Sequence, residues 1–181
     1  MLITDNQLKL SRYPILDLTP EIQECNDSHI VYIWTDGGSY EDYGSIGVVV
    51  VDQGIVTMTF GAFLGRHVSN NIAELEAIIK GLRLVKHLNR PVVIFTDSAY
   101  ALYSLCDIFA GSKNREVIES IQAYIDIYPH KVSFVKVKGH DGLIYNEIAD
   151  KIASNLLQSR PQGHTHSTKK SKKKSLKDDT L

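Results

Sequence analysis

Residues 29–39 read HIVYIWTDGGS, an apolar run rich in β-branched and aromatic side chains that stops at an aspartate followed by two glycines. Such a run predicts a buried β-strand, and the residues after it are typical of a turn. Residues 91–98, PVVIFTDS, repeat the pattern, because an apolar run again ends in Thr-Asp. One aspartate in this position is most often a turn former or a helix cap. Two of them make Asp36 and Asp97 candidate site residues, since ligands bind at the C-terminal edge of open α/β sheets.

The remaining elements follow from the spacing of apolar side chains. Between residues 70 and 88 they recur every three or four positions, which predicts an amphipathic helix with Ser69 or Asn70 as its cap. The short Asp52-Gln53-Gly54 segment between two apolar runs predicts a hairpin. Three strands in succession and then alternating helices and strands predict an α/β domain with a mixed sheet. The expected strands are 29–35, 46–51, 55–64, 91–96 and 131–137, and the expected helices are 70–88, 99–106, 115–127 and 145–157.

Two further carboxylates and a histidine extend the candidate site. Glu74 lies one position from the apolar stripe of the 70–88 helix, with Glu76 as a nearby rival. Asp150 lies on the last predicted helix, ten residues after His140, whose loop contains two glycines. Gathered carboxylates repel one another unless a cation holds them, and hard oxygen ligands select Mg²⁺ or Mn²⁺. These residue types therefore indicate a two-metal centre for phosphoryl transfer.

Four segments of the chain, in order, resemble the motifs of type 1 ribonuclease H. The resemblance covers about residues 30–157. It implies a five-stranded mixed sheet flanked by helices, and an endoribonuclease that hydrolyses the RNA strand of RNA–DNA hybrids to 5′-phosphate and 3′-hydroxyl ends. It also selects Glu74 over Glu76. The segments are Thr35-Asp36-Gly37-Gly38-Ser39, Asn70-Asn71-Ile72-Ala73-Glu74-Leu75, Thr96-Asp97-Ser98-Ala99-Tyr100, and Val137-Lys138-Gly139-His140 with Asn146-Glu147-Ile148-Ala149-Asp150.

The resemblance assigns a role to each candidate residue. Two Mg²⁺ ions, or Mn²⁺, are expected, with Asp36 bridging both. Glu74 and Asp97 would hold the ion that activates water, and Asp150 would bind beside the nucleophile or the second ion. His140 resembles the family's mobile histidine, which assists proton transfer or product release. The expected substrate-binding residues, which would contact the hybrid's minor groove and a DNA-strand phosphate, are Ser39, Ser69, Asn70 and Asn71.

The sequence also departs from the family pattern. Residues 107–115 are short and only mildly basic, where some relatives carry a basic, Trp-rich handle. Ala99 stands where many relatives have Gln. Residues 40–44, Tyr-Glu-Asp-Tyr-Gly, take the place of the family's usual Asn-Pro-Gly. Two other functions stay open: a nuclease of the same fold that acts on another nucleic acid, such as a DNA junction, or a non-catalytic nucleic-acid-binding module. A sugar-kinase-like or actin-like ATPase needs two such domains, which 181 residues cannot supply.

Composition divides the chain into three regions. Residues 1–29 are expected to form an irregular N-terminal arm, 30–158 the ribonuclease H domain, and 159–181 a disordered Lys-rich tail. Residues 1–159 hold 13 Lys and Arg against 19 Asp and Glu, net −6, whereas 160–181 hold 7 against 2, net +5. The tail is a candidate for contacts with phosphates or another partner, its cluster being Lys169, Lys170, Lys172, Lys173 and Lys174.

The remaining expectations concern location and assembly. The N-terminal sequence lacks the features of a signal peptide, and no apolar run approaches the roughly 20 residues that span a bilayer. Two cysteines suit no disulfide framework, and Cys106 on an apolar stretch is expected to fill core space. We therefore expect a cytoplasmic monomer with no membrane contact, or a nuclear one if the Lys-rich tail acts as an import signal in a eukaryotic or viral source.

Overall fold

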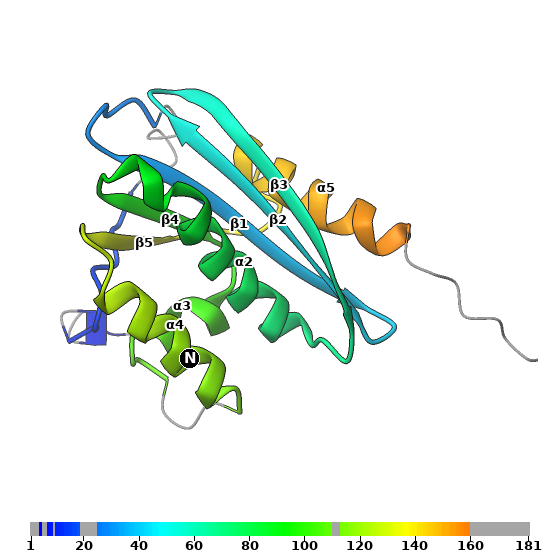
Figure 1. The fold of residues 1–181 in the computed structure, drawn as a ribbon. Coiled ribbons are helices and arrows are strands. Elements are labelled where there is room, and N and C mark those ends of the chain that lie inside the picture. The colour runs from blue at the N-terminus through cyan, green and yellow to red at the C-terminus, as the bar shows by residue number, and fades with distance from the viewer. Residues whose placement is uncertain (1–3, 5–6, 9, 19–24, 110–112, 160–181) are drawn as a thin grey trace, which may run out of the picture.

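A twisted sheet of five strands forms the centre of the molecule (Figure 1). The computed structural model describes residues 4, 7–8, 10–18, 25–109 and 113–159. The strand order is β3-β2-β1-β4-β5, in which β3, β2 and β1 are antiparallel and β1, β4 and β5 are parallel. The predicted mixed sheet is thus confirmed. Its strands are β1 (Val31–Tyr40), β2 (Tyr43–Asp52), β3 (Ile55–Arg66), β4 (Val92–Thr96) and β5 (Val132–Lys136).

Helices cover both faces of the sheet (Figure 1). One face carries α2 (Asn70–Val85) with the 3₁₀ turn η2 (Lys86–Leu88), α3 (Ala99–Leu105) and α4 (Arg115–Asp126). The other face carries α5 (Ile144–Gln158). Within the described part of the chain, none of these helices is long and apolar enough to cross a membrane.

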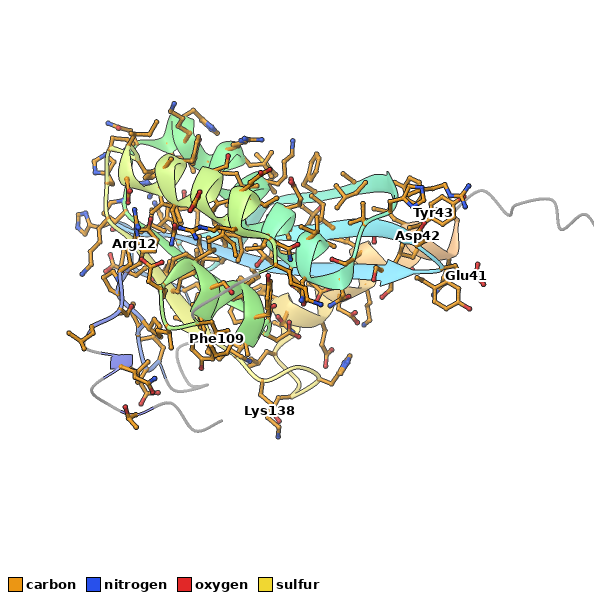
Figure 2. All side chains as sticks on the ribbon, turned by 90° about the horizontal axis from the view of Figure 1, so that it is seen from below. Arg12, Glu41, Asp42, Tyr43, Phe109 and Lys138 are labelled. Carbon is orange, nitrogen blue, oxygen red and sulfur yellow. The ribbon has the colours of Figure 1, made fainter. Side chains whose placement is uncertain are left out.

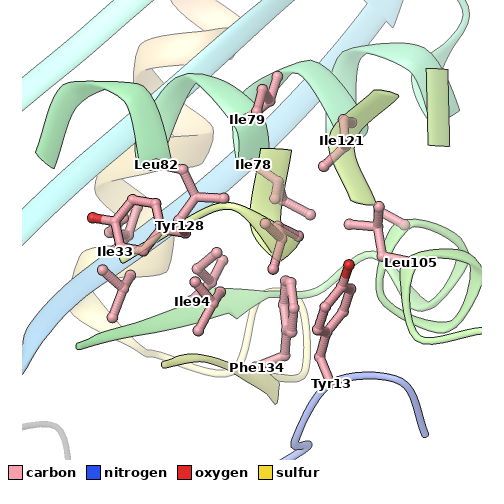
Figure 3. Packing of buried hydrophobic residues seen from close by; sticks show 14 of the residues in the cluster. Tyr13, Ile33, Ile78, Ile79, Leu82, Ile94, Leu105, Ile121, Tyr128 and Phe134 are labelled. Carbon is pink, nitrogen blue, oxygen red and sulfur yellow. The ribbon is translucent and has the colours of Figure 1, made fainter. Parts of the chain in front are cut away.

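Alternate residues of the strands fill two hydrophobic cores. Ile33 points into the first core, where isoleucines and leucines of α2 pack against the strands and α4 (Figure 3). Trp34 points into the second core and stacks on Phe95 with ring centroids 4.0 Å apart, beneath α5. Each cysteine is fully buried in one of these cores, so Cys106 fills core space as predicted and Cys25 does the same on the α5 side.

β1 continues beyond the point where its parallel neighbour ends. β4 pairs with β1 only as far as Thr35 opposite Thr96, whereas β1 runs on to Tyr40 beside β2. The predicted turn at 36–39 is therefore wrong, because those residues belong to the strand. The turn comes at Glu41 and Asp42, whose φ angles of 47° and 72° suit a tight hairpin, and Figure 2 shows both at its tip.

Two glycines allow helices to approach β1 and β2 closely. A Cβ atom at Gly37 would lie 2.2 Å from the backbone nitrogen of Glu74 in α2. A Cβ atom at Gly47 would lie 2.0 Å from the carbonyl oxygen of Ala149 in α5. Gly47 is also the β2 partner of Asp36. The two helices therefore reach the same level of the sheet from opposite faces, and their acidic residues are brought to either side of Asp36.

An N-terminal segment, residues 12–16, runs along the outer edge of β5. Ile15 forms a parallel bridge with Phe134, and the Leu16 amide donates to the Phe134 carbonyl over 2.8 Å. Arg12 anchors the segment through ion pairs with Asp107 and Asp126. This segment covers an edge that would otherwise offer unpaired backbone groups. Of the predicted disordered tail, all residues after Ser159 lie outside the described part of the chain.

Candidate active site

Three carboxylates from three different elements converge at the end of the parallel strands. Asp36 comes from β1, Glu74 from α2, and Asp97 from the residue after β4. Each offers an oxygen atom within 4.8 Å of the others. The adjacency follows from the register, because Asp36 and Asp97 directly succeed the last β1–β4 pair, Thr35 and Thr96. Asp36 and Glu74 are only 8% and 5% exposed, whereas Asp97 is half-buried and leaves the triad open to water on its side.

Burial and mutual repulsion raise the pKa of two of these acids. Burial is the main cause for Asp36, whose pKa rises to about 7, with further contributions from the charges of Asp97 and Asp150. Burial also dominates for Glu74, whose pKa rises to about 9, with repulsion from Asp36 and Asp97. A hydrogen bond of 3.2 Å from the Gly37 amide to Glu74 Oε2 acts in the opposite direction. The site is thus short of positive charge.

The other two predicted catalytic residues lie beside the triad. Asp150, on α5, accepts a hydrogen bond of 3.2 Å from Ser154 Oγ, and its charge raises the pKa of Asp36. It does not belong to the set of oxygen atoms within 4.8 Å of one another. His140 is exposed on the loop after β5, the loop on which Figure 2 labels Lys138, and its charge lowers the pKa of Asp36. Its φ of 55° places the His140 backbone in the left-handed region.

The predicted substrate-binding residues lie where β1 meets the start of α2. Ser69 caps α2 by accepting from the Ile72 amide over 3.3 Å, so Ser69 is the cap and Asn70 is the first helical residue. The Ser39 amide donates to Asn70 Oδ1 over 3.2 Å, and Asn71 is exposed. Ser39 and Asn70 line a cavity of about 530 Å³ that extends to the end of α5. Uncharged polar groups thus line a cavity formed by β1, α2 and α5, the elements that carry Asp36, Glu74 and Asp150.

Two residues near the triad were not assigned a role from the sequence. Asn146, only 3% exposed, donates from Nδ2 to Asp97 Oδ2 over 3.4 Å, while its buried Oδ1 has no hydrogen-bond partner among the described residues. Lys136 ends β5 half-buried, and its charge lowers the pKa of Glu74. A signal existed for each: Asn146 lies one helical turn before Asp150, and Lys136 interrupts an apolar strand.

The residues present fit a divalent cation. Mg²⁺ binds oxygen ligands at about 2.0–2.1 Å in octahedral geometry, so three oxygen atoms that share one ion lie roughly 3–4 Å apart. The oxygen atoms of Asp36, Glu74 and Asp97 lie within 4.8 Å of one another, which small side-chain adjustments bring into that range. The raised pKa values of Asp36 and Glu74 mark charge that a cation would compensate. Fold and site together define an α/β enzyme built around an acidic metal-binding centre.

Comparison with known proteins identifies the family. The RNase H family model matches residues 28–158. Ribonuclease H of Caldicellulosiruptor saccharolyticus is 29% identical over 142 residues, which cover 71% of this chain and 96% of that protein. Ribonuclease H of Bordetella pertussis is 32% identical over 152 residues, covering 76% and 96%. The chain therefore belongs to the RNase H family, a family of metal-dependent endoribonucleases.

Solved structures show the same fold. The N-terminal RNase H domain of a Mycobacterium tuberculosis protein is similar with a TM-score of 0.63 and 22% identity, covering 72% of this chain and 95% of that one. LC11-RNase H1, solved in complex with an RNA/DNA hybrid, is similar with a TM-score of 0.60 and 21% identity, covering 70% and 99%. The predicted ribonuclease H-like fold is thereby confirmed.

Proposed function

We propose that this chain cleaves the RNA strand of RNA–DNA hybrids to 5′-phosphate and 3′-hydroxyl ends by a two-metal mechanism. The observation that carries the proposal is the convergence of Asp36, Glu74 and Asp97 within 4.8 Å, beside uncharged hydroxyl and amide groups. Family membership and the hybrid bound to LC11-RNase H1 support the same substrate class.

Each acid has a distinct task in this proposal. Asp36 lies between α2 and α5 and would be shared by two Mg²⁺ ions, with Mn²⁺ as a substitute. Glu74 and Asp97 would hold one of these ions with it, and Asp150 would hold the other. When bound, such ions lower the pKa of water and stabilise the leaving 3′ oxygen. No side chain has to act as a nucleophile.

The remaining residues bind substrate and move protons. His140 lies on an exposed loop near Asp36, where an imidazole can accept or deliver a proton as product leaves. Asn70 and Ser39 line the cavity between β1, α2 and α5, and Ser69 and Asn71 adjoin Asn70 in the chain. Such donors and acceptors suit the 2′-hydroxyl, which distinguishes RNA from DNA in a minor groove.

Cleavage assays with Mg²⁺ or Mn²⁺ on a hybrid, duplex DNA and duplex RNA test the substrate. We expect cleavage of the hybrid alone, confined to the RNA strand. Cleavage of duplex DNA would assign the chain to a nuclease of the same fold with another substrate. Binding of hybrid without any cleavage would make it a binding module.

Substitution of the triad tests the site. We expect Asp97→Asn to abolish cleavage and to weaken Mn²⁺ binding measured by calorimetry, while the fold is retained because one repulsive charge is removed. Glu76→Gln is the matched control, since Glu76 lies on the same helix but lines the groove between α2 and α4. Full activity of Asp97→Asn, or equal loss in both variants, would contradict the proposed site.

A further inference from the structure

In the described domain, three cations along α2 and η2, Lys80, Arg83 and Lys86, lie against aromatic rings and not against carboxylates. Arg12, Arg90, Arg115 and Lys138 are each held by a carboxylate. By contrast, Lys80 Nζ lies 4.2 Å from the ring centroid of Phe60. The Arg83 guanidinium and Lys86 Nζ lie 5.7 and 5.9 Å from the ring centroid of Tyr124. In the part of the chain that the structure describes, none of these three forms an ion pair with a carboxylate.

These cations follow one another along the C-terminal half of α2 and into η2. We call Lys80, Arg83, Lys86 and the exposed His87 the α2 basic stripe. Lys80, Arg83 and Lys86 follow one another at intervals of three residues, so each lies beside the next on the helix surface, and His87 adjoins Lys86. Phe60 belongs to β3 and Tyr124 to α4, the helix beside α2 in Figure 1, so aromatic rings support the stripe from both flanks.

Aromatic support leaves the charge of the stripe available. A cation over an exposed ring gains about 0.5–1 kcal/mol and is not neutralised, whereas a carboxylate partner cancels its field. Glu76 and Glu116 line the neighbouring groove with Arg83 but form no ion pair with it among the described residues. An unneutralised row of cations on a body of net charge −6 is a site for an anion that extends along the helix.

The position of the stripe relative to the triad identifies the anion. At about 1.5 Å of rise per residue, Lys80 and Lys86 lie roughly 9 and 18 Å along α2 from Glu74. A nucleic-acid duplex has a phosphate every 3.4 Å or so along each strand, so a few base pairs bridge that gap. α3 ends at Leu105 and α4 begins at Arg115, so the segment between them is too short to supply a basic handle.

We infer that the α2 basic stripe binds the phosphate backbone of the substrate duplex several base pairs from the cleaved bond. The identity of this duplex as an RNA–DNA hybrid rests on the proposed function. Three neutralised phosphates contribute roughly 2–3 to the slope of log affinity against log salt concentration. Phosphate contacts do not depend on base sequence, so the stripe should bind duplex DNA as well as a hybrid.

The test measures duplex affinity across a salt series in the full chain. The variants carry Asp97→Asn, so that no substrate is cleaved during the titration. We expect Lys80→Gln with Arg83→Gln and Lys86→Gln to make the slope shallower by roughly 2–3 and to weaken binding at low salt more than 10-fold. The matched control, Lys80→Arg with Arg83→Lys and Lys86→Arg, retains the charges and should retain the slope.

Equal slopes for the neutralised and charge-retaining variants would overturn the inference. Lys86→Gln alone is a second measurement, since this exposed side chain can be changed without disturbing the fold, and it should shift the slope by about one. Cleavage by the chain with an intact triad is assayed separately in Mg²⁺. Absence of cleavage with a stripe-dependent slope would contradict only the proposed function, and cleavage with an unchanged slope would contradict only the stripe.

Discussion

The buried Asn146 side chain orients the half-buried carboxylate of Asp97 through a hydrogen bond of 3.4 Å. We expect Asn146→Ala to weaken Mn²⁺ binding about 10-fold, because residues that orient metal ligands typically contribute that much. The free energy of unfolding should fall by less than about 2 kcal/mol, since the lost hydrogen bond is long and a buried acceptor without a partner is removed with it. Mn²⁺ titration followed by electron paramagnetic resonance and a urea unfolding curve measure the two effects.

Asn155→Ala is the matched control, because Asn155 lies exposed on the same helix. It should change neither quantity by more than about 0.5 kcal/mol or its equivalent in affinity. Unchanged Mn²⁺ affinity in Asn146→Ala would show that Asp97 is oriented by the backbone alone.

His140 should be helpful but dispensable. Its φ of 55° would strain alanine, so His140→Asn is the better test, since asparagine tolerates this conformation. We expect turnover on hybrid to fall on the order of 10²-fold, a typical contribution of one proton-transfer group, with KM little changed. Steady-state kinetics with Mg²⁺ measure it. Inactivity as complete as that of Asp97→Asn would make the histidine a ligand or an essential base.

At the scale of elements, contact between α5 and β2 determines where Asp150 lies. Gly47→Ala would place a Cβ 2.0 Å from the Ala149 carbonyl, which is backbone and cannot rotate away. We expect α5 to shift, the free energy of unfolding to fall by about 1–3 kcal/mol, and hybrid cleavage to fall further than this loss of stability explains. Urea unfolding and cleavage rates at saturating Mg²⁺ measure both.

Gly61→Ala provides the comparison, because its Cβ would meet side-chain atoms of Ile152 and Leu156 on the same helix. Side chains can change rotamer, so this variant should lose less activity for the same loss of stability. If the two glycine variants lost activity in parallel, the close approach at Gly47 would matter for stability alone.

Most elements could be predicted because each carries its own local signal. Apolar runs predict the strands, and the three- and four-residue spacing of apolar side chains predicts α2. The predicted helix covers 70–88, whereas α2 in the structure ends at Val85. The extension of β1 to Tyr40 could not be predicted, because it depends on pairing with β2. Glycine is typical of turns, yet Gly37 lies within β1, where the absence of a side chain lets α2 pack closely against the strand.

The candidate site was predictable to the same extent. Asp36 and Asp97 each follow an apolar strand, and the resemblance distinguished Glu74 from Glu76, so the sequence named the acids that the structure brings together. Asn146 and Lys136 were not assigned because their proximity to these acids arises only when α5 and β5 pack at the end of the sheet. Contacts of that kind have no local signature.

At the scale of the whole molecule, charge is distributed unevenly between the acidic body and the tail. We expect truncation after Gln158 to leave a folded enzyme, because α5 ends there and residues 160–181 contain only two leucines. Hybrid affinity should fall at low salt and its salt dependence become shallower, by roughly 0.7–0.9 for each phosphate that a tail lysine neutralises. Turnover at saturating substrate should persist. Binding across a salt series compares the two chains, and identical slopes would exclude the tail from substrate binding.

The segment that covers β5 has a consequence for the order of events during translation. Arg12 and its partner Asp126 are 114 positions apart in the chain, and ribosomes add about 5–20 residues per second. The segment therefore emerges roughly 6–23 s before Asp126, and until β5 follows a few residues later the segment has no sheet edge to pair with. Slow elongation would prolong this vulnerable interval, so cellular yield should depend on translation speed and on holdase chaperones.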